Sequence, residues 1–250
     1  MSTPWRDAWH TLRPRPDDPH GPLAPMLVLL TVVTGLVDAF SYLELGRVFV
    51  ANMTGNVVFL SFALGGAPGF LWWASLLAVL TFLLGAFLGG RIGATSGGHR
   101  GRHLFAAAAT QTALLLAAVI LTLIVPTPAP RDSYDGVLLT VLIVILGIAM
   151  GLQNATARGL GVPDLTTTVL TMTLTGMGAD SRFAGGRDSR IGRRLLSVVA
   201  MFLGGLCGVL LIESGQGRWV LVCATLLLGG VTLWTARSRR ATTGWVTKPA

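Results

Sequence analysis

The sequence predicts an all-α polytopic membrane protein with six full transmembrane helices and two short re-entrant or broken helices. Three observations support this: an apolar composition, six long hydrophobic segments, and basic residues that fall between them. Of the 250 residues, 52% are hydrophobic and 12% are charged, whereas a soluble domain has about 25% charged residues. The net charge of +8 is spread over short stretches between apolar runs, which indicates membrane orientation rather than nucleic-acid binding. We therefore expect the lipid bilayer as partner and no nucleic acid.

Six segments are long enough to cross a bilayer, since a transmembrane helix needs about 20 mostly apolar residues. Residues 1–21 and 237–250 flank them as expected cytoplasmic tails. The N-terminal tail has prolines, mixed charges and no apolar core, so we expect it to be mobile and not a signal peptide. The six segments are Leu23 to Leu43, Phe70 to Arg91, Leu104 to Val125, Gly136 to Ala157, Leu195 to Ile212 and Trp219 to Ala236.

Two further apolar stretches, Ala51 to Gly66 and Leu165 to Gly178, are shorter and rich in Asn, Thr and Gly. Arginine in short loops marks the cytoplasmic face, which bears on whether these stretches cross. If all eight stretches crossed, the basic loops around Arg100 and Arg190 would lie on opposite faces. If the short stretches enter and leave by one face, both loops and both termini are cytoplasmic. Loop charge therefore favours six spans, while hydropathy alone also permits eight.

The two short stretches occupy corresponding places in an internal repeat. The halves, about 22–125 and 136–236 of a single transmembrane domain 22–236, contain three crossings each, so the second is inverted. Inverted repeats are typical of transporters, whose ligand sites form near the midplane where interrupted segments meet. The alignment pairs Gly35 with Gly151, Asp38 with Asn154, Thr54 with Thr171, Gly85 with Gly204 and Gly89 with Gly208.

Asp38 lies inside the first predicted span. A carboxylate at a helix centre costs about 2.5 to 3.5 kcal/mol on insertion scales, so Asp38 should face the bundle interior with a partner. Arg158 and Arg47 are the candidate partners. A functional site and a purely structural role in holding helices together are equally consistent with this residue.

Amides and hydroxyls gather in the interrupted stretches. A break at Gly55 in VANMTGN would let its polar side chains face one cavity, whereas the alternative is that they cap broken backbone. For the amides of QNATAR, the alternative is interhelical hydrogen bonding, worth about 0.6 kcal/mol per contact. The candidate substrate site comprises Asp38, Asn52, Thr54, Asn56, Gln153, Asn154, Arg158, Thr167, Thr168 and Thr171.

Three GxxxG pairs predict close helix packing and would also permit a homo-oligomer. His99 and His103 are four residues apart, but flanking Gly and Arg favour a solvated loop over a metal site, so we expect neither a metal nor a cofactor. No nucleophile and base pair is visible, so we expect no enzyme. The packing glycines are Gly85, Gly89, Gly147, Gly151, Gly204 and Gly208.

The stretches GLVDAFSYLELGRVFVANMTGN and GLQNATARGLGVPDLTTTVLTMTLT resemble the YoaK-like family of small bacterial integral membrane proteins, a domain of unknown function. The resemblance covers about residues 25–236. Where the family typically reads TG in the second half, this chain has Thr171-Met172. The resemblance implies the bacterial inner membrane and brings no established substrate or catalytic residues.

The sequence therefore favours a bacterial inner-membrane transporter or channel for a small polar or ionic solute. Its basis is two matched polar interruptions in an otherwise apolar chain. The alternative is a non-transporting membrane scaffold or assembly factor, in which the same polar groups only bind helices together.

Overall fold

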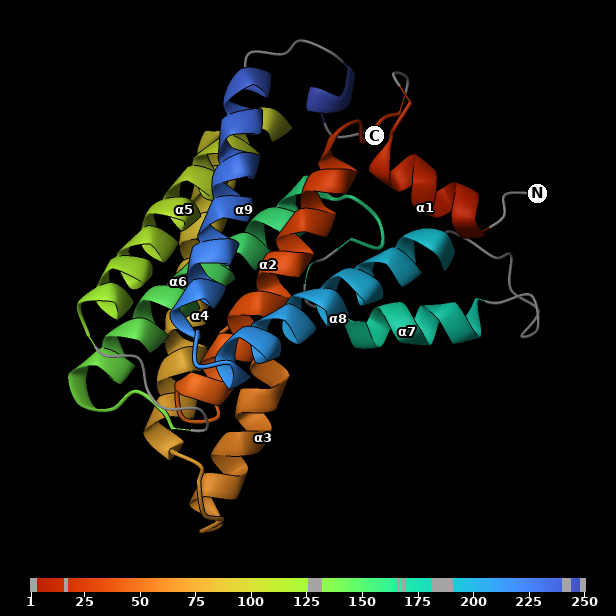
Figure 1. Cartoon of the computed structure of the whole chain (residues 1–250). Coiled ribbons are helices and arrows are strands. Elements are labelled where there is room, and N and C mark those ends of the chain that lie inside the picture. Colours follow the sequence, from red (N-terminus) through yellow and green to blue (C-terminus); the bar gives the residue numbers. More distant parts are fainter. Residues whose placement is uncertain are drawn as a thin grey trace.

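The computed structural model describes residues 4–15, 18–125, 132–165, 167, 170–180, 191–239 and 244–247. Over these residues the secondary structure is helical, with no strand. The helices are α1 (Pro4–Leu12), α2 (Leu23–Glu44), α3 (Met53–Leu64), α4 (Trp72–Thr95), α5 (Arg100–Ile124), α6 (Gly136–Leu160), α7 (Leu170–Ala179), α8 (Ile191–Glu213) and α9 (Arg218–Ser238), followed by the 3-10 turn η2 (Gly244–Val246) (Figure 1).

Six helices are long and apolar enough to cross a membrane, namely α2, α4, α5, α6, α8 and α9. They fall on the six predicted segments, which confirms the predicted polytopic helical fold. With 12 residues, α3 is only about 18 Å long at 1.5 Å per residue, against a hydrocarbon core of about 30 Å. With 10 residues, α7 is shorter still.

Hydrogen bonds between helix ends show the relative directions of α2, α5 and α6. At one end of the bundle, Arg100 at the start of α5 donates to the carbonyl oxygens of Leu160, which ends α6, at 2.7 Å, and of Pro19, just before α2, at 3.1 Å. At the other end, the N–H of Tyr134, before α6, donates to the carbonyl oxygen of Glu44, which ends α2, at 2.9 Å. Helices α2 and α5 therefore run antiparallel to α6, as an inverted repeat requires.

We call the end at Arg100 the basic end and the other the opposite end. Arginines cluster at the basic end because the last turns of α4, α6 and α9 and the first turns of α5 and α8 all lie there. They are Arg91, Arg100, Arg102, Arg158, Arg193, Arg194, Arg237 and Arg239.

The first short segment is re-entrant. After α2 ends at the opposite end, residues 45–52 turn back into the bundle without helical structure. The Ala51 N–H then donates to the Asp38 carboxylate at 3.0 Å, six residues before Glu44 and so about 9 Å deeper along α2. From there α3 runs outward again to the start of α4, where it projects from the lower end of the bundle (Figure 1).

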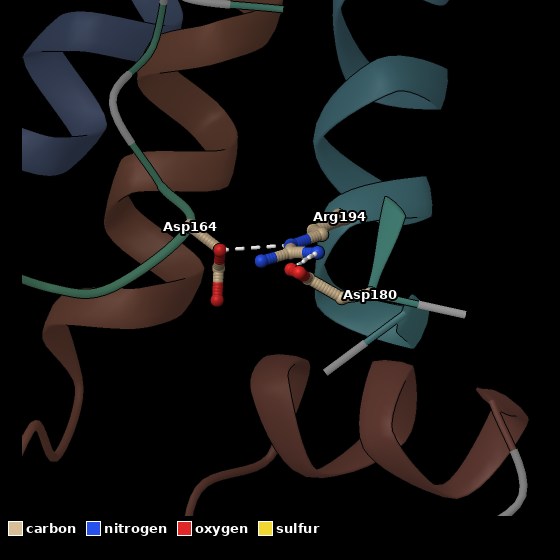
Figure 2. Close-up of polar contacts among 3 residues, drawn as sticks. All are labelled: Asp164, Asp180 and Arg194. Atoms are coloured by element: carbon tan, nitrogen blue, oxygen red, sulfur yellow. Dashed lines mark hydrogen bonds and ion pairs between the residues drawn. The ribbon is translucent and has the colours of Figure 1, made fainter. Parts of the chain in front are cut away.

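The second short segment enters and leaves by the basic end. Asp164, which follows α6, and Asp180, which follows α7, both pair with Arg194 near the start of α8, at 2.9 and 2.8 Å (Figure 2). Both flanks of α7 thus lie at one end of the bundle. This arrangement favours six crossings over eight.

The main helix pairings join one half of the repeat to the other. Helix α4 packs on α6, and α2 packs on α8. On the first pair, a Cβ atom at Gly85 would collide with the carbonyl oxygen of Ile148, and one at Gly151 with that of Phe82. A Cβ atom at Gly89 would lie 2.8 Å from the Leu152 carbonyl oxygen, and one at Gly147 would collide with the Thr81 hydroxyl.

The pairing of α2 with α8 repeats these contacts. A Cβ atom at Gly204 would collide with the carbonyl oxygen of Val32, and one at Gly35 with that of Met201, while Gly208 lies against Ala39. These contacts correspond to those of the first pair under the sequence alignment. The glycines predicted to pack helices closely therefore do so between the halves.

The N-terminal segment differs from the expected mobile tail over residues 4–12. These residues form α1, which packs on the start of α8, where Arg193 donates to the buried hydroxyl of Thr11 at 3.4 Å. Farther along, Arg100 also donates to the carbonyl oxygen of Trp245 at 3.3 Å. The buried guanidinium of Arg100 thus bonds one segment that precedes the membrane domain and one that follows it.

Single cysteines at Gly65 and Gly178 distinguish six spans from eight. In a background without Cys207 and Cys223, Gly65→Cys and Gly178→Cys should react with a membrane-impermeant maleimide from opposite faces of proteoliposomes, because each re-entrant segment returns to its own end. Both glycines are exposed, so labelling should not be blocked. Labelling from the same face would show that the short segments cross.

A matched pair of glycine substitutions tests the packing between halves. Gly151→Ala should lower the free energy of unfolding by about 1–3 kcal/mol, the usual cost of overpacking. Gly229→Ala, with nothing within 4 Å of the added atom, should leave it unchanged or slightly raised, since Ala favours helix. Titration with dodecyl sulfate in mixed micelles, followed by circular dichroism, measures both. Equal stabilities would contradict the packing described.

Candidate functional site

The Asp38 carboxylate binds the tip of the first re-entrant segment. One oxygen accepts the Ala51 N–H at 3.0 Å and the other accepts the Asn52 side-chain amide. Asp38 is 4% exposed, as expected for a group facing the bundle interior. The predicted arginine partner is wrong: Arg47 lies over the Phe70 ring, 5.8 Å from its centroid, and Arg158 is exposed at the basic end. Neutral amide donors satisfy the carboxylate instead.

Beside Asp38 lies a pocket of about 350 Å³ between α2, α8 and the chain that precedes α3. Tyr42 and Phe49 form one wall, with their rings stacked at 5.0 Å between centroids. The pocket is apolar apart from the Asp38 carboxylate, the Asn52 amide and the Tyr42 hydroxyl. Its lining is Gly35, Asp38, Ala39, Tyr42, Leu43, Phe49, Asn52, Met201, Gly205 and Val209.

Asn56 supports the pocket wall from behind. Its amide accepts the Phe49 N–H at 2.9 Å and donates to the Phe49 carbonyl oxygen at 2.5 Å. Gly55 makes room for the same residue, since a Cβ atom there would lie 2.7 Å from the Phe49 ring. The MTGN motif therefore fixes Phe49, while Thr54 is exposed and takes no position in the pocket.

Gln153 lies elsewhere, in a buried amide network. Its side chain accepts from Gln111 of α5 at 2.7 Å and donates to Thr34 of α2 at 2.8 Å and to the Leu30 carbonyl oxygen at 3.2 Å. The network joins three helices with matched neutral donors and acceptors. This is the interhelical hydrogen bonding that the sequence left open for Gln153.

The candidates of the second half lie nearer the basic end. Asn154, the counterpart of Asp38, donates to the Met150 carbonyl oxygen at 3.0 Å, and Thr171 in α7 is exposed. Thr167 is buried at a φ of 59°, and its hydroxyl has no hydrogen-bond partner among the described residues. Thr168 lies outside the described residues. Of the nine candidates that the structure describes, only Asp38 and Asn52 line the pocket between α2 and α8.

Both re-entrant segments begin with the same backbone reversal. Arg47 and Asp164, at the spacing that pairs Thr54 with Thr171, are non-glycine residues with φ values of 61° and 63°. In each half an arginine then connects the start of the segment to its end. Arg47 contacts Gly69 and Phe70, and Arg194 bridges Asp164 and Asp180 (Figure 2).

His103 differs from the expected solvated loop, while His99 lies in the short turn before α5 and is half-buried. His99 caps α5 by accepting the Arg102 N–H at 3.2 Å. His103 lies one turn into α5, 7% exposed, with its ring against Gly93 and Gly159. The glycines that make room for the His103 ring thus come from α4 and α6, whereas Gly97 and Gly98, which flank His99, turn the chain with φ values of 60° and 74°.

A second buried carboxylate, Glu44, was not singled out from the sequence. It is 3% exposed at the end of α2, and a Cβ atom at Gly217 would collide with it. Burial, together with the nearby charge of Glu44, raises the pKa of Tyr134 to about 12. Tyr134 therefore stays a neutral phenol at any physiological pH.

Other residues of the site also lacked a clear sequence signal. The Ala51 N–H is a backbone donor, and Tyr42 and Phe49 resemble ordinary apolar residues of a membrane protein. Gln111 could have been found, because it is an amide in the middle of the apolar stretch AAAATQTALLLAA.

Comparison with known proteins agrees with this architecture. The family described as "Protein of unknown function (DUF1275)" matches residues 26–234. The UPF0700 transmembrane protein YoaK of Bacillus subtilis (strain 168) is 36% identical over 149 residues, which cover 60% of this chain and 63% of that protein. The alignment thus spans less than two thirds of that relative. No solved structure matches.

Asp164→Asn should loosen the second re-entrant segment. One hydrogen bond to a charged group contributes about 1.5–3 kcal/mol, so the amides of α7 should exchange with deuterium about tenfold faster or more. Asp180→Asn should have a smaller effect, because Asp180 is 48% exposed whereas Asp164 is 19% exposed. Hydrogen–deuterium exchange with mass spectrometry measures this, and peptides of α3 serve as the internal control. Unchanged exchange in α7 for both variants would show that Arg194 does not hold the segment.

Proposed function

The chain belongs to the DUF1275 family, and on that premise we propose that it transports a small polar or ionic solute across the bilayer through the Asp38 pocket. One observation carries the proposal: a carboxylate at membrane depth forms the wall of a pocket and is held by a re-entrant segment. Irregular backbone at this depth is tolerated where it is buried or lines a cavity. An intramembrane ionisable residue is by default a functional-site hypothesis.

Comparison with the Gln153 network favours a ligand-binding role for Asp38 over a packing role. Where this chain only needs to join helices, it uses neutral amides that satisfy one another. A carboxylate at the centre of a helix costs about 2.5 to 3.5 kcal/mol on insertion scales. An ionisable carboxyl retained beside a pocket therefore points to a ligand better than to helix packing.

The architecture supports the same proposal. The two halves are antiparallel, each carries one interrupted segment, and these segments open to opposite ends of the bundle. Many secondary transporters are built on this plan. The pocket is lined by α2 from the first half and α8 from the second, so relative movement of the halves would change its access.

For location, we propose the bacterial inner membrane with both termini in the cytoplasm. The basic end carries Arg91, Arg100, Arg102, Arg158, Arg193, Arg194, Arg237 and Arg239, and arginine near the membrane marks the cytoplasmic side. Under this orientation the Asp38 pocket is reached from the outer half of the bilayer. The start and the end of α7 face the cytoplasm.

A non-transporting scaffold is the competing function. The close glycine contacts and the Gln111–Gln153 bond favour it, because they show how much of the polar and small-residue content serves packing alone. A scaffold requires no solute to move, and it predicts that Asp38 affects stability only.

Flux through proteoliposomes separates the two functions. Three probes cover the charge classes: methylammonium and acetate, followed by uptake of the radiolabelled compounds, and glycerol, followed by stopped-flow light scattering. Wild-type protein should move at least one probe more than tenfold faster than empty liposomes. Asp38→Asn and Asn52→Ala should lower that rate towards the rate of empty liposomes. The first removes the carboxylate, and the second removes an amide that donates to it.

Glu213→Gln is the matched control, because it makes a carboxylate-to-amide change at an exposed position at the end of α8. It should keep the wild-type rate. Flux that survives Asp38→Asn would rule out the proposed site. A wild type that moves none of the three probes, while Asp38→Asn lowers its thermal stability, would favour the scaffold.

A further inference from the structure

The substrate class can be narrowed from the lining of the pocket. We propose that the Asp38 pocket binds an amphipathic organic monocation, and that this cation and a proton occupy the carboxylate alternately. The inference rests on the proposed transport function and adds the identity of the solute class and its coupling. It follows from four properties of the pocket: its charge, its apolar surface, its aromatic wall and its opening.

The first property is charge. Asp38 is the one charged residue among those described as lining the pocket. The ionised carboxylate would repel an anion, and a neutral solute would supply no counter-charge to keep Asp38 ionised in a medium of low dielectric. The Ala51 and Asn52 donors fix the orientation of the carboxylate but bring no positive charge. A ligand with a single positive charge supplies what the pocket lacks.

The second property is the apolar surface. Ala39, Leu43, Met201 and Val209 supply aliphatic side chains to the lining, and such a surface gains free energy by covering hydrocarbon. A bare metal ion is a poor fit, since calcium takes six to eight oxygen ligands and magnesium an octahedral shell. The volume of about 350 Å³ falls within the range of small-molecule sites.

The third property is the aromatic wall. A cation above the face of Tyr42 or Phe49 is attracted by the ring quadrupole. Phe49 is held in place at both its N–H and its carbonyl oxygen by Asn56, and it stacks on Tyr42 and Phe59 at 5.0 and 5.6 Å. The wall is therefore in position before a ligand arrives, which lowers the entropic cost of binding.

The fourth property is that the pocket opens at the surface of the bundle, beside the close contact of α2 with α8. Phe202 and Leu206, which directly follow the lining residues Met201 and Gly205 of α8, are exposed on the outer surface of the bundle. This surface faces lipid in a membrane, so a cation with a hydrocarbon body can reach the pocket from the bilayer. A strongly hydrated small ion could not use this route at comparable cost.

Exchange with a proton follows from the same burial. An ionised carboxylate without a counter-charge is costly in this environment, so the empty pocket holds the neutral acid. When the cation binds, the O–H bond of Asp38 breaks, one proton leaves to water, and the carboxylate pairs with the cation. One positive charge enters and one leaves, so the net charge of the site is unchanged.

Asp38 is the carboxyl group among the described lining residues, so the released proton is expected to come from it. On α2, Tyr42 also lines the pocket, while Glu44 lies against Gly217 and away from it. Helix α8 contributes Met201, Gly205 and Val209, and the segment before α3 contributes Phe49 and Asn52, none of which titrates. Proton release on binding therefore reports on Asp38.

Binding of benzyltrimethylammonium to the full chain in lipid nanodiscs tests the inference, with benzoate and benzyl alcohol as anionic and neutral probes of similar shape. Isothermal titration calorimetry should show binding of the cation alone. Because binding releases a proton, the affinity should rise about tenfold for each unit by which the pH is raised, as long as the free Asp38 is protonated. A pH indicator in weak buffer should record one proton released per cation bound. Asp38→Asn should weaken binding at least tenfold and abolish the release.

Two further variants keep the test decisive. Glu213→Gln should leave cation affinity unchanged. Tyr42→Leu, which retains the carboxylate, should weaken cation binding several-fold and still release a proton, and it replaces Asp38→Asn if that variant does not fold. Equal binding of the three probes, or cation binding without proton release, would overturn the inference.

The outcomes also separate this inference from transport itself. If acetate or glycerol flux requires Asp38 while benzyltrimethylammonium does not bind, transport stands and the cation assignment is wrong. If the cation binds through Asp38 and releases a proton but no probe crosses the membrane, the ligand class stands and transport is wrong.

Discussion

The fold depends on how the chain satisfies non-helical backbone inside the membrane. Residues 45–52 are not helical, and in lipid an unsatisfied N–H or carbonyl group costs several kcal/mol. Asp38 accepts the Ala51 N–H, and Asn56 pairs with both backbone groups of Phe49. These two side chains allow the segment to turn at this depth. They also create the pocket, because the same turn presents Phe49 and Asn52 to α2.

The two halves of the repeat cannot be considered separately. The glycine contacts of α4 are with α6, and those of α8 are with α2, so each half completes the packing of the other. At the centre, Thr112 of α5 and Thr232 of α9 lie 2.9 Å apart, where corresponding helices of the two halves cross. The symmetry stops at the sites: Asp38 corresponds to Asn154, so only the first half carries a charge there. The two halves of the repeat thus share a backbone arrangement and differ in the side chain at this position.

The spans and the repeat could be predicted from the sequence because both depend on composition and spacing. Length and hydropathy located all six crossings, and loop charge favoured re-entry of the short stretches. The partner of Asp38 could not be predicted, because a backbone N–H leaves no mark in a sequence and the arginines considered for it are occupied elsewhere. The sequence could not separate Gln153 from the residues around Asp38 for a similar reason, because its partner Gln111 is distant along the chain. The helix at residues 4–12 depends on packing against α8, which local sequence does not reveal.

Sequence distance also sets the order in which these bonds can form during synthesis. The donors to Asp38 lie 13 and 14 residues after it, so they leave the ribosome within seconds of the carboxylate, while α2 is still at the insertion machinery. Gln153 bonds Thr34 across 119 residues, and that contact must wait until the second half has entered the membrane. The Asp38 carboxylate is therefore hydrogen-bonded early by the re-entrant segment that follows α2, and the neutral amide of Gln153 joins the halves late. Biogenesis of this protein can begin with a complete first segment before its partner helices exist.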